Sequence, residues 1–164
     1  FTEMKKKQIS LLEISLMILL IAIVIVTFLQ VLFRYLLHFS LGWTEELARF
    51  LLLWLASLAC AYGFKTKSHF VLKFFVDLFP PLPKKAIKTL VTFGLSLFMG
   101  LFIWKALEYT IKVANQTAPS TRISMAFPYS SAAVGGILML YYILKNWWFE
   151  IKGEKSRDFS EEQE

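Results

Sequence analysis

The feature that constrains this chain most is residues 14–33, a run of 20 residues without a charged side chain. The hydrocarbon core of a bilayer is about 30 Å thick and a helix rises about 1.5 Å per residue, so about 20 apolar residues can cross it. The run contains only Ser15, Thr27 and Gln30 as polar residues. A helix of a soluble bundle needs a polar face. A soluble bundle with an apolar core is therefore disfavoured.

Three further charge-free runs follow, at residues 50–64, 89–104 and 123–144. The last is long enough to span a bilayer, and the two shorter runs need flanking residues whose long basic side chains reach the interface. The chain is 57% hydrophobic and 18% charged, against about 45–50% and 25% in soluble domains. We predict an all-α integral membrane protein with a transmembrane domain over residues 14–149. Its four transmembrane helices cover about 14–35, 45–65, 86–107 and 123–148.

The basic residues are distributed unevenly over the connections. Thirteen Lys and Arg residues lie before the first run, between the second and third, and after the fourth, whereas five lie in the other two connections. Because basic connections stay in the cytoplasm, we expect both termini there. Trp43 and Trp104 would then mark the outer interface, and Trp147 and Trp148 the inner one.

The two ends of the chain are expected to lie outside the bundle. Residues 1–13 form a cytoplasmic segment, and residues 1–3, which precede Met4, are interpreted as the remnant of a cleaved tag. Residues 150–164 are charged and poor in aromatic residues. We expect them to form a disordered cytoplasmic tail.

The connection between the second and third helices contains an amphipathic pattern. Polar residues recur at spacings of three and four among apolar ones, at Thr66, His69, Lys73 and Asp77. A narrow polar stripe on an apolar helix is typical of a helix that lies in the membrane interface. We therefore predict an interfacial helix over about 66–79, ended by the prolines of residues 80–83. A re-entrant hairpin remains the alternative.

The densest polar cluster lies at residues 43–49, Trp-Thr-Glu-Glu-Leu-Ala-Arg. Arg49 follows Glu45 by four residues and Glu46 by three, so one guanidinium could pair with both carboxylates. Thr44 is the expected N-cap. The cluster either only begins the second helix and anchors it at the interface, or also binds a partner at membrane depth. Arg34, at the end of the first helix, could join it.

Small residues suggest faces for close helix packing. Ala56, Cys60 and Gly63 form a stripe on the second helix, and Gly135 and Gly136 lie in the outer half of the fourth. These faces would contact each other within the bundle or contact another chain. The first arrangement is favoured.

No pattern indicates catalysis or a bound cofactor. The four runs contain no ionisable group at their middles, where a coupled carrier usually needs one. The two histidines, His38 and His69, fall in connections, which disfavours a haem site, and one cysteine excludes a cysteine-cluster metal site. The net charge of +6 orients helices against lipid better than it explains nucleic-acid binding. We expect no enzyme activity, no cofactor and no metal on this chain.

Three elements in register resemble the small membrane subunit (DctQ-like) of tripartite ATP-independent periplasmic (TRAP) transporters. They are Arg34 and Tyr35 at the end of the first helix, the Glu-Glu-x-x-Arg of residues 45–49, and His69 closely followed by Val71. The resemblance is looser at residues 121–129. There the family often has Ile-Pro-Met where this chain has Ile-Ser-Met, and an acid that often follows the valine is Leu72 here.

The resemblance implies a multi-pass protein of the bacterial inner membrane. Its partners would be membrane lipids, a large membrane subunit with the sodium and substrate sites, and a periplasmic binding protein that delivers an organic acid, such as sialic acid or a C4-dicarboxylate. This chain would stabilise the static scaffold of the large subunit and help dock the binding protein. A self-sufficient homo-oligomeric transporter or channel is the main alternative, and a membrane anchor of a redox enzyme is another.

Overall fold

The computed structural model describes residues 10–36, 38, 41–77 and 84–151, and the side chains of residues 67–77, 84–88 and 150–151 are not described. The described chain is all-helical, as predicted. Its helices are α1 (Leu11–Leu36), α2 (Gly42–Asp77), α3 (Lys84–Lys112) and α4 (Ala126–Ile151). Each contains a segment long and apolar enough to cross a membrane. The prediction of four transmembrane helices is confirmed.

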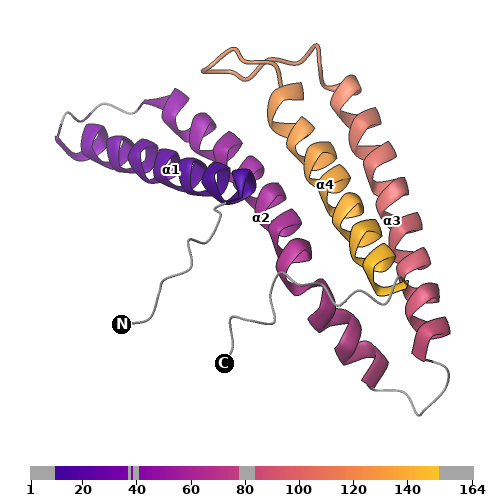
Figure 1. Ribbon diagram of the computed structural model, residues 1–164. Helices are drawn as coiled ribbons and strands as arrows, with labels where there is room; N and C mark the ends of the chain where they lie inside the picture. Colours follow the sequence, from indigo (N-terminus) through magenta and orange to yellow (C-terminus); the bar gives the residue numbers. More distant parts are fainter. Residues whose placement is uncertain (1–9, 37, 39–40, 78–83, 152–164) are drawn as a thin grey trace, which may run out of the picture.

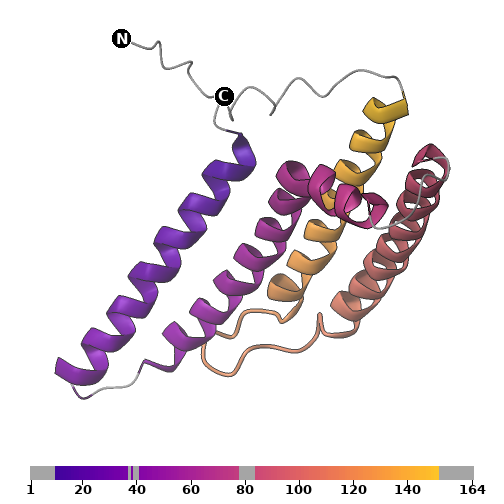
Figure 2. The same cartoon turned by 90° about the horizontal axis from the view of Figure 1, so that it is seen from below.

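The helices are ordered α1–α2–α4–α3 across the bundle (Figures 1 and 2). Among the described residues, α4 contacts both α2 and α3, while α2 and α3 touch each other only slightly. Within the described ranges, the first helix contacts α2 and no other helix. The fourth helix is therefore the centre of the bundle, and α1 is its outermost member.

The second helix is longer than predicted. Its backbone stays helical to Asp77, so residues 66–77 continue α2 directly, and Figure 2 shows its last turns running in a different direction from its first part. Residues 78–79 and the side chains of His69, Lys73 and Asp77 lie outside the described residues. The interfacial position of this segment stays a prediction.

The fourth helix begins at Ala126, three residues later than expected. Thr117 and Ser124 form an antiparallel bridge, and the Ala118 N–H donates to the Ile123 carbonyl at 2.9 Å. Residues paired in this way cannot also make helical hydrogen bonds. The Ser124 hydroxyl oxygen then accepts from the Ala126 N–H at 3.2 Å and caps the new helix.

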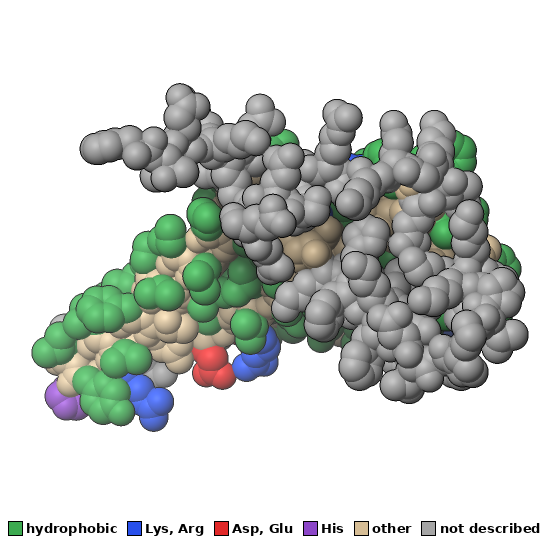
Figure 3. All heavy atoms as spheres, turned by 60° about the horizontal axis from the view of Figure 1, so that its bottom comes forward, with side chains coloured by type: hydrophobic (Ala, Val, Ile, Leu, Met, Phe, Trp, Pro, Cys, Tyr) green, Lys and Arg blue, Asp and Glu red, His purple; other side chains and the backbone are tan. Residues whose placement is uncertain are grey.

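Apolar side chains cover the outside of the bundle. No residue of α1 is buried, and Phe28 of α1 and Leu101 of α3 are 63% and 61% exposed. Figure 3 shows hydrophobic side chains over much of the described surface on one side, with charged groups at an edge. Such a surface is stable when lipid or a membrane partner covers it.

The buried residues are mainly small. They include Ala61, Ala133 and Ser131, at most 3% exposed. Small side chains allow helix backbones to approach closely, which favours packing in a membrane where no hydrophobic effect drives helices together. The core therefore lies where α4 meets its neighbours.

Candidate partner-contact site at one end of the bundle

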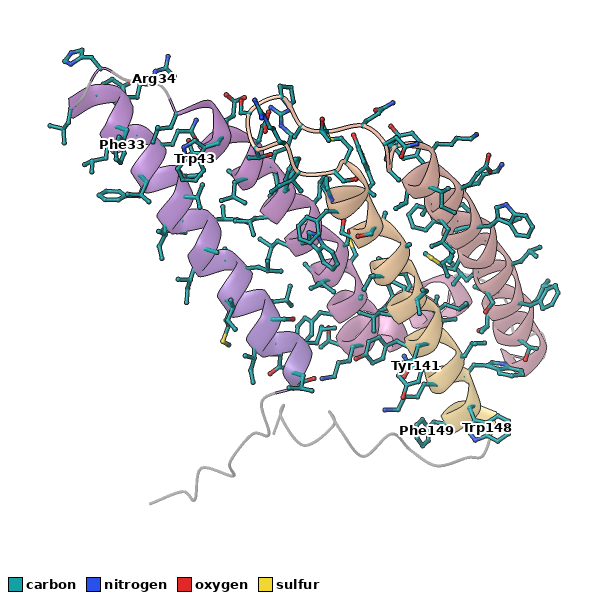
Figure 4. All side chains as sticks on the ribbon, turned by 90° about the horizontal axis from the view of Figure 1, so that it is seen from above. Phe33, Arg34, Trp43, Tyr141, Trp148 and Phe149 are labelled. Atoms are coloured by element: carbon teal, nitrogen blue, oxygen red, sulfur yellow. The ribbon has the colours of Figure 1, made fainter. Side chains whose placement is uncertain are left out.

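The end of α1, the start of α2 at Gly42 and residues 113–125, which cross from α3 to α4, lie at one end of the bundle, which we call the loop end (Figure 1). Figure 4 shows Arg34 and Trp43 at this end, and Tyr141, Trp148 and Phe149 at the opposite end. Aromatic residues at both ends are typical of a membrane-spanning bundle.

Glu45 and Arg49 pair with each other on adjacent turns of α2. The Arg49 Nη2 lies 3.0 Å from the Glu45 Oε1, and both side chains are about two-thirds exposed, at 66% and 65%. An ion pair this exposed contributes little to stability in water. Its position on an open face makes it accessible to a partner.

Glu46 turns the other way, toward the α3–α4 connection. Its carboxylate accepts hydrogen bonds from the Ser120 N–H at 2.9 Å, the Thr121 N–H at 2.8 Å and the Thr121 hydroxyl at 2.9 Å. We call this arrangement the Glu46 latch. The prediction that Arg49 also pairs with Glu46 is wrong within the described chain. Three donors from the connection already occupy the Glu46 carboxylate.

The predicted N-cap role of Thr44 is also wrong. Helix α2 already begins at Gly42, and the fully buried Thr44 side chain donates its hydroxyl to the Leu41 carbonyl at 2.6 Å. A Cβ on Gly42 would lie 2.9 Å from the Ser120 hydroxyl oxygen. The glycine therefore lets the start of α2 pack against the α3–α4 connection.

The two remaining predicted members of the cluster, Trp43 and Arg34, are exposed to solvent or lipid. Trp43 is 44% exposed. Arg34 is exposed in the last turn of α1, and within the described residues the structure does not bring it into the Glu45–Arg49 pair. The loop end thus carries an ion pair, a latched connection and a separate guanidinium.

The glycines of α4 sit in close helix contacts. A Cβ on Gly135 would lie 2.9 Å from both the Cβ and the carbonyl oxygen of Ser57 in α2, and a Cβ on Gly136 would lie 2.9 Å from Ile103 Cγ1 in α3. The Ser57 and Ser131 hydroxyls lie 3.4 Å apart, at the same α2–α4 interface. Helix α4 therefore packs closely against α2 through Gly135 and against α3 through Gly136.

The small residues of α2 lie about a quarter turn around that helix from Ser57. Ala56 and Cys60 are exposed, and nothing lies within 4 Å of a Cβ built on Gly63. The favoured expectation that this stripe packs within the bundle is therefore wrong. On a helical wheel the stripe continues the face of Glu45 and Arg49. We call residues 45, 49, 56, 60 and 63 the open face of α2.

Sequence reasoning missed three ion pairs. Lys65 of α2 lies 3.9 Å from Glu13 of α1, and both side chains are largely buried, at 20% and 13% exposed. Their sequence separation hid this pair. At the loop end Glu108 pairs with Lys105 and Lys112, each at 2.7 Å, and here the spacing of three and four residues was a usable signal.

No cluster of three His, Cys, Asp or Glu side chains suited to a metal ion occurs in the part of the chain that the structure describes. The contacts above are structural contacts between helices and a connection. The arrangement offers surfaces for binding another protein.

Comparison with known proteins identifies the family. The family model described as "Tripartite ATP-independent periplasmic transporters, DctQ component" matches residues 23–153. The chain belongs to this family. A putative TRAP transporter small permease protein of Haemophilus influenzae is 25% identical over 150 residues, which are 87% of this chain and 91% of that protein.

A second relative has a more specific name. The sialic acid TRAP transporter small permease protein SiaQ of Vibrio cholerae is 27% identical over 108 residues, 66% of this chain and 62% of that protein. This DctQ-family chain is therefore a small permease subunit of a TRAP transporter. It is a transporter component of the multi-pass, inner-membrane type, as the resemblance implied.

Proposed function

We propose that this chain is a scaffold subunit that does not itself transport and that stabilises the large membrane subunit of a sodium-coupled organic-acid importer. The observation that carries the proposal is the placement of charge. The four apolar runs contain no Asp, Glu, Lys, Arg or His, and the described carboxylates Glu13, Glu45, Glu46 and Glu108 lie near helix ends. A chain whose own middle offers no charge is suited to support a neighbouring subunit that binds the ion.

The open face of α2 is the surface we assign to the large subunit. Its small side chains allow a neighbouring transmembrane helix to approach closely, and the Glu45–Arg49 pair at its end can exchange hydrogen bonds with polar groups there. The contacts of Gly135 and Gly136 are already used inside the chain. The open face of α2 makes no such contact among the described residues, and it points away from Lys65, the α2 residue that pairs with α1.

The substrate and sodium sites are assigned to the large subunit. The name of the Vibrio cholerae relative refers to sialic acid, and this supports an organic acid of that kind, with a C4-dicarboxylate as the other family substrate class. No cofactor is proposed for this chain.

We also propose that the loop end faces the periplasm and helps receive the binding protein. The support is the distribution of basic residues, thirteen on the opposite connections and termini against five here. The latched α3–α4 connection gives this end a fixed surface.

Reconstitution tests the division of labour. Proteoliposomes containing this chain, the large subunit, or both are supplied with binding protein, labelled substrate and an inward sodium gradient. Uptake is expected with both subunits and not with this chain alone. Sodium-driven uptake by this chain alone would refute the scaffold role.

A pair of matched variants tests the open face. Gly63→Leu and Gly100→Leu each add the same side chain where nothing lies within 4 Å of the Cβ, the first on α2 and the second on α3. We expect Gly63→Leu to reduce co-purification with the large subunit and Gly100→Leu to leave it intact. Equal co-purification of both variants would exclude the assignment of this face.

A further inference from the structure

Arg122, in the α3–α4 connection, has a backbone conformation that an arginine rarely adopts. Its φ is 55°, and its side chain is exposed. For an L residue with a Cβ this left-handed conformation is unfavourable, and Asn, Asp and Gly are the residues that occupy it most readily. A strained residue of another type at a surface is a reason to look for a function of its side chain.

The surrounding connection holds Arg122 in this conformation. Its N–H donates to the Ala118 carbonyl at 3.0 Å, and the Ala118 N–H donates to the Ile123 carbonyl at 2.9 Å. The Glu46 latch fixes Ser120 and Thr121, the two residues before Arg122. The tip of the connection is therefore tied both to itself and to α2, and little conformational freedom is left to lose on binding a partner.

The guanidinium of Arg122 has no ion pair or hydrogen bond within the described residues. The described carboxylates at this end are occupied: Glu45 by Arg49, Glu46 by Ser120 and Thr121, and Glu108 by Lys105 and Lys112. The loop end has five basic residues and three acidic ones. A free cation therefore sits on a surface with excess positive charge. Ile123 beside it is 38% exposed.

We propose that Arg122 is a contact residue for carboxylates on the surface of the periplasmic binding protein. This rests on the proposed function, in which the loop end faces the periplasm. An arginine binds a carboxylate through two parallel hydrogen bonds, and arginines beside apolar groups are enriched among the residues that dominate protein interfaces. The connection crosses the end of the bundle, beyond the last turn of α3 (Figure 1), where a soluble protein can reach it.

The test uses the complex of this chain with the large subunit in nanodiscs, titrated with the binding protein at low and high salt. Arg122→Glu is expected to weaken binding by about tenfold or more at low salt, because it places like charges together. Arg122→Lys keeps the positive charge but cannot form two parallel hydrogen bonds with a carboxylate, so we expect the affinity to fall by about threefold. Affinity of Arg122→Glu equal to that of the wild type would overturn the proposal.

Arg34→Glu is the matched control, because Arg34 is another exposed arginine at the same end without an ion pair among the described residues. The same change of charge there should alter affinity by less than about threefold. If both variants weaken binding equally, general electrostatic attraction explains the effect and a specific Arg122 contact is excluded.

Arg122→Gly separates contact from folding. Glycine adopts a positive φ without strain, so the thermal midpoint of the complex should stay the same or rise. The affinity for the binding protein should fall, because the positive charge of the side chain is lost. Unchanged binding together with a raised midpoint would show that Arg122 is merely a strained loop residue.

Anionic lipid is the competing ligand for a free guanidinium. Nanodiscs of phosphatidylcholine with and without phosphatidylglycerol distinguish the binding protein from anionic lipid as the ligand. We expect Arg122→Glu to lower the affinity for the binding protein in both kinds of nanodisc. An effect confined to phosphatidylglycerol discs would assign Arg122 to lipid. If the wild-type complex binds no binding protein, the docking role itself fails. If it binds and Arg122→Glu binds equally, only this inference fails.

Discussion

The two sides of α2 differ in how they are held. Toward α4, the contact is close: Gly135 lies against the Ser57 backbone, Ser57 and Ser131 hydroxyls approach to 3.4 Å, and the Glu46 latch ties the helix start to the α3–α4 connection. Toward α1, the described polar contact is the Glu13–Lys65 pair at 3.9 Å, and no residue of α1 is buried.

From this difference we expect α1 to be attached less firmly than α4. The bundle of α2, α4 and α3 is fixed by shape, because backbones meet where side chains are absent. Helix α1 contacts α2 alone among the described helices and buries no residue of its own.

The largest effect is expected from Gly135→Ala. The new methyl group would lie 2.9 Å from the Ser57 carbonyl oxygen, and a backbone atom in a packed helix cannot move aside. Such overpacking costs about 1–3 kcal/mol. Thermal unfolding of the purified chain in detergent measures the loss.

The matched control for that prediction is Gly94→Ala in α3, where nothing lies within 4 Å of the added Cβ. There the helix propensity of alanine should stabilise the protein by up to about 1 kcal/mol. If Gly135→Ala is no less stable than Gly94→Ala, the close α2–α4 contact does not exist.

The next effect is expected from Glu46→Ala, which leaves the N–H groups of Ser120 and Thr121 without their acceptor. The thermal midpoint should fall by several degrees, and proteolysis within the α3–α4 connection should become faster, because unsatisfied donors must turn to water. Glu45→Ala removes a neighbouring acid outside the latch and serves as the control. Equal behaviour of the two variants would argue against the latch.

A smaller effect is expected at the α1–α2 contact. A double-mutant cycle with Glu13→Gln and Lys65→Gln should give a coupling of about 0.5–1 kcal/mol, as for a partly buried pair at long distance. The measurement is again thermal unfolding in detergent. A coupling as large as the Gly135→Ala effect would mean that α1 is as firmly fixed as α4.

The smallest effect on the isolated chain is expected from Arg49→Ala. The Glu45–Arg49 pair is two-thirds exposed, so its loss should cost about 0.5 kcal/mol or less. In the complex with the large subunit the same change should reduce co-purification, because the pair lies on the open face of α2. A large loss of stability in the isolated chain would contradict this description.

Much of the helical architecture could be read from residue patterns. The run of residues 14–33 must form a helix in the bilayer, since lipid offers no hydrogen-bond partners for the backbone N–H and C=O groups. Helix ends were harder to predict. The start of α4 depended on the Thr117–Ser124 bridge, and the end of α2 on continued helical pairing past Thr66. Both depend on contacts that local propensity does not encode.

The partners of charged residues were the least predictable part of the candidate site. Spacing along one helix gave the Glu45–Arg49 pair correctly and wrongly added Glu46. The partner of Glu46 is 74 residues away in sequence, and that of Glu13 lies on another helix. Spacing within a helix cannot reveal such contacts.

By itself, the sequence determined that lipid is the solvent, that four helices cross it, and to which family the chain belongs, because uncharged runs of this length and three motifs in register are local properties. Only the tertiary structure decided which glycines meet a neighbouring backbone. It also decided that, among the described residues, one face of α2 stays open and Arg122 has a strained backbone and no ion pair. These are decided by how helices rotate and lean against one another, and that choice depends on all four helices at once.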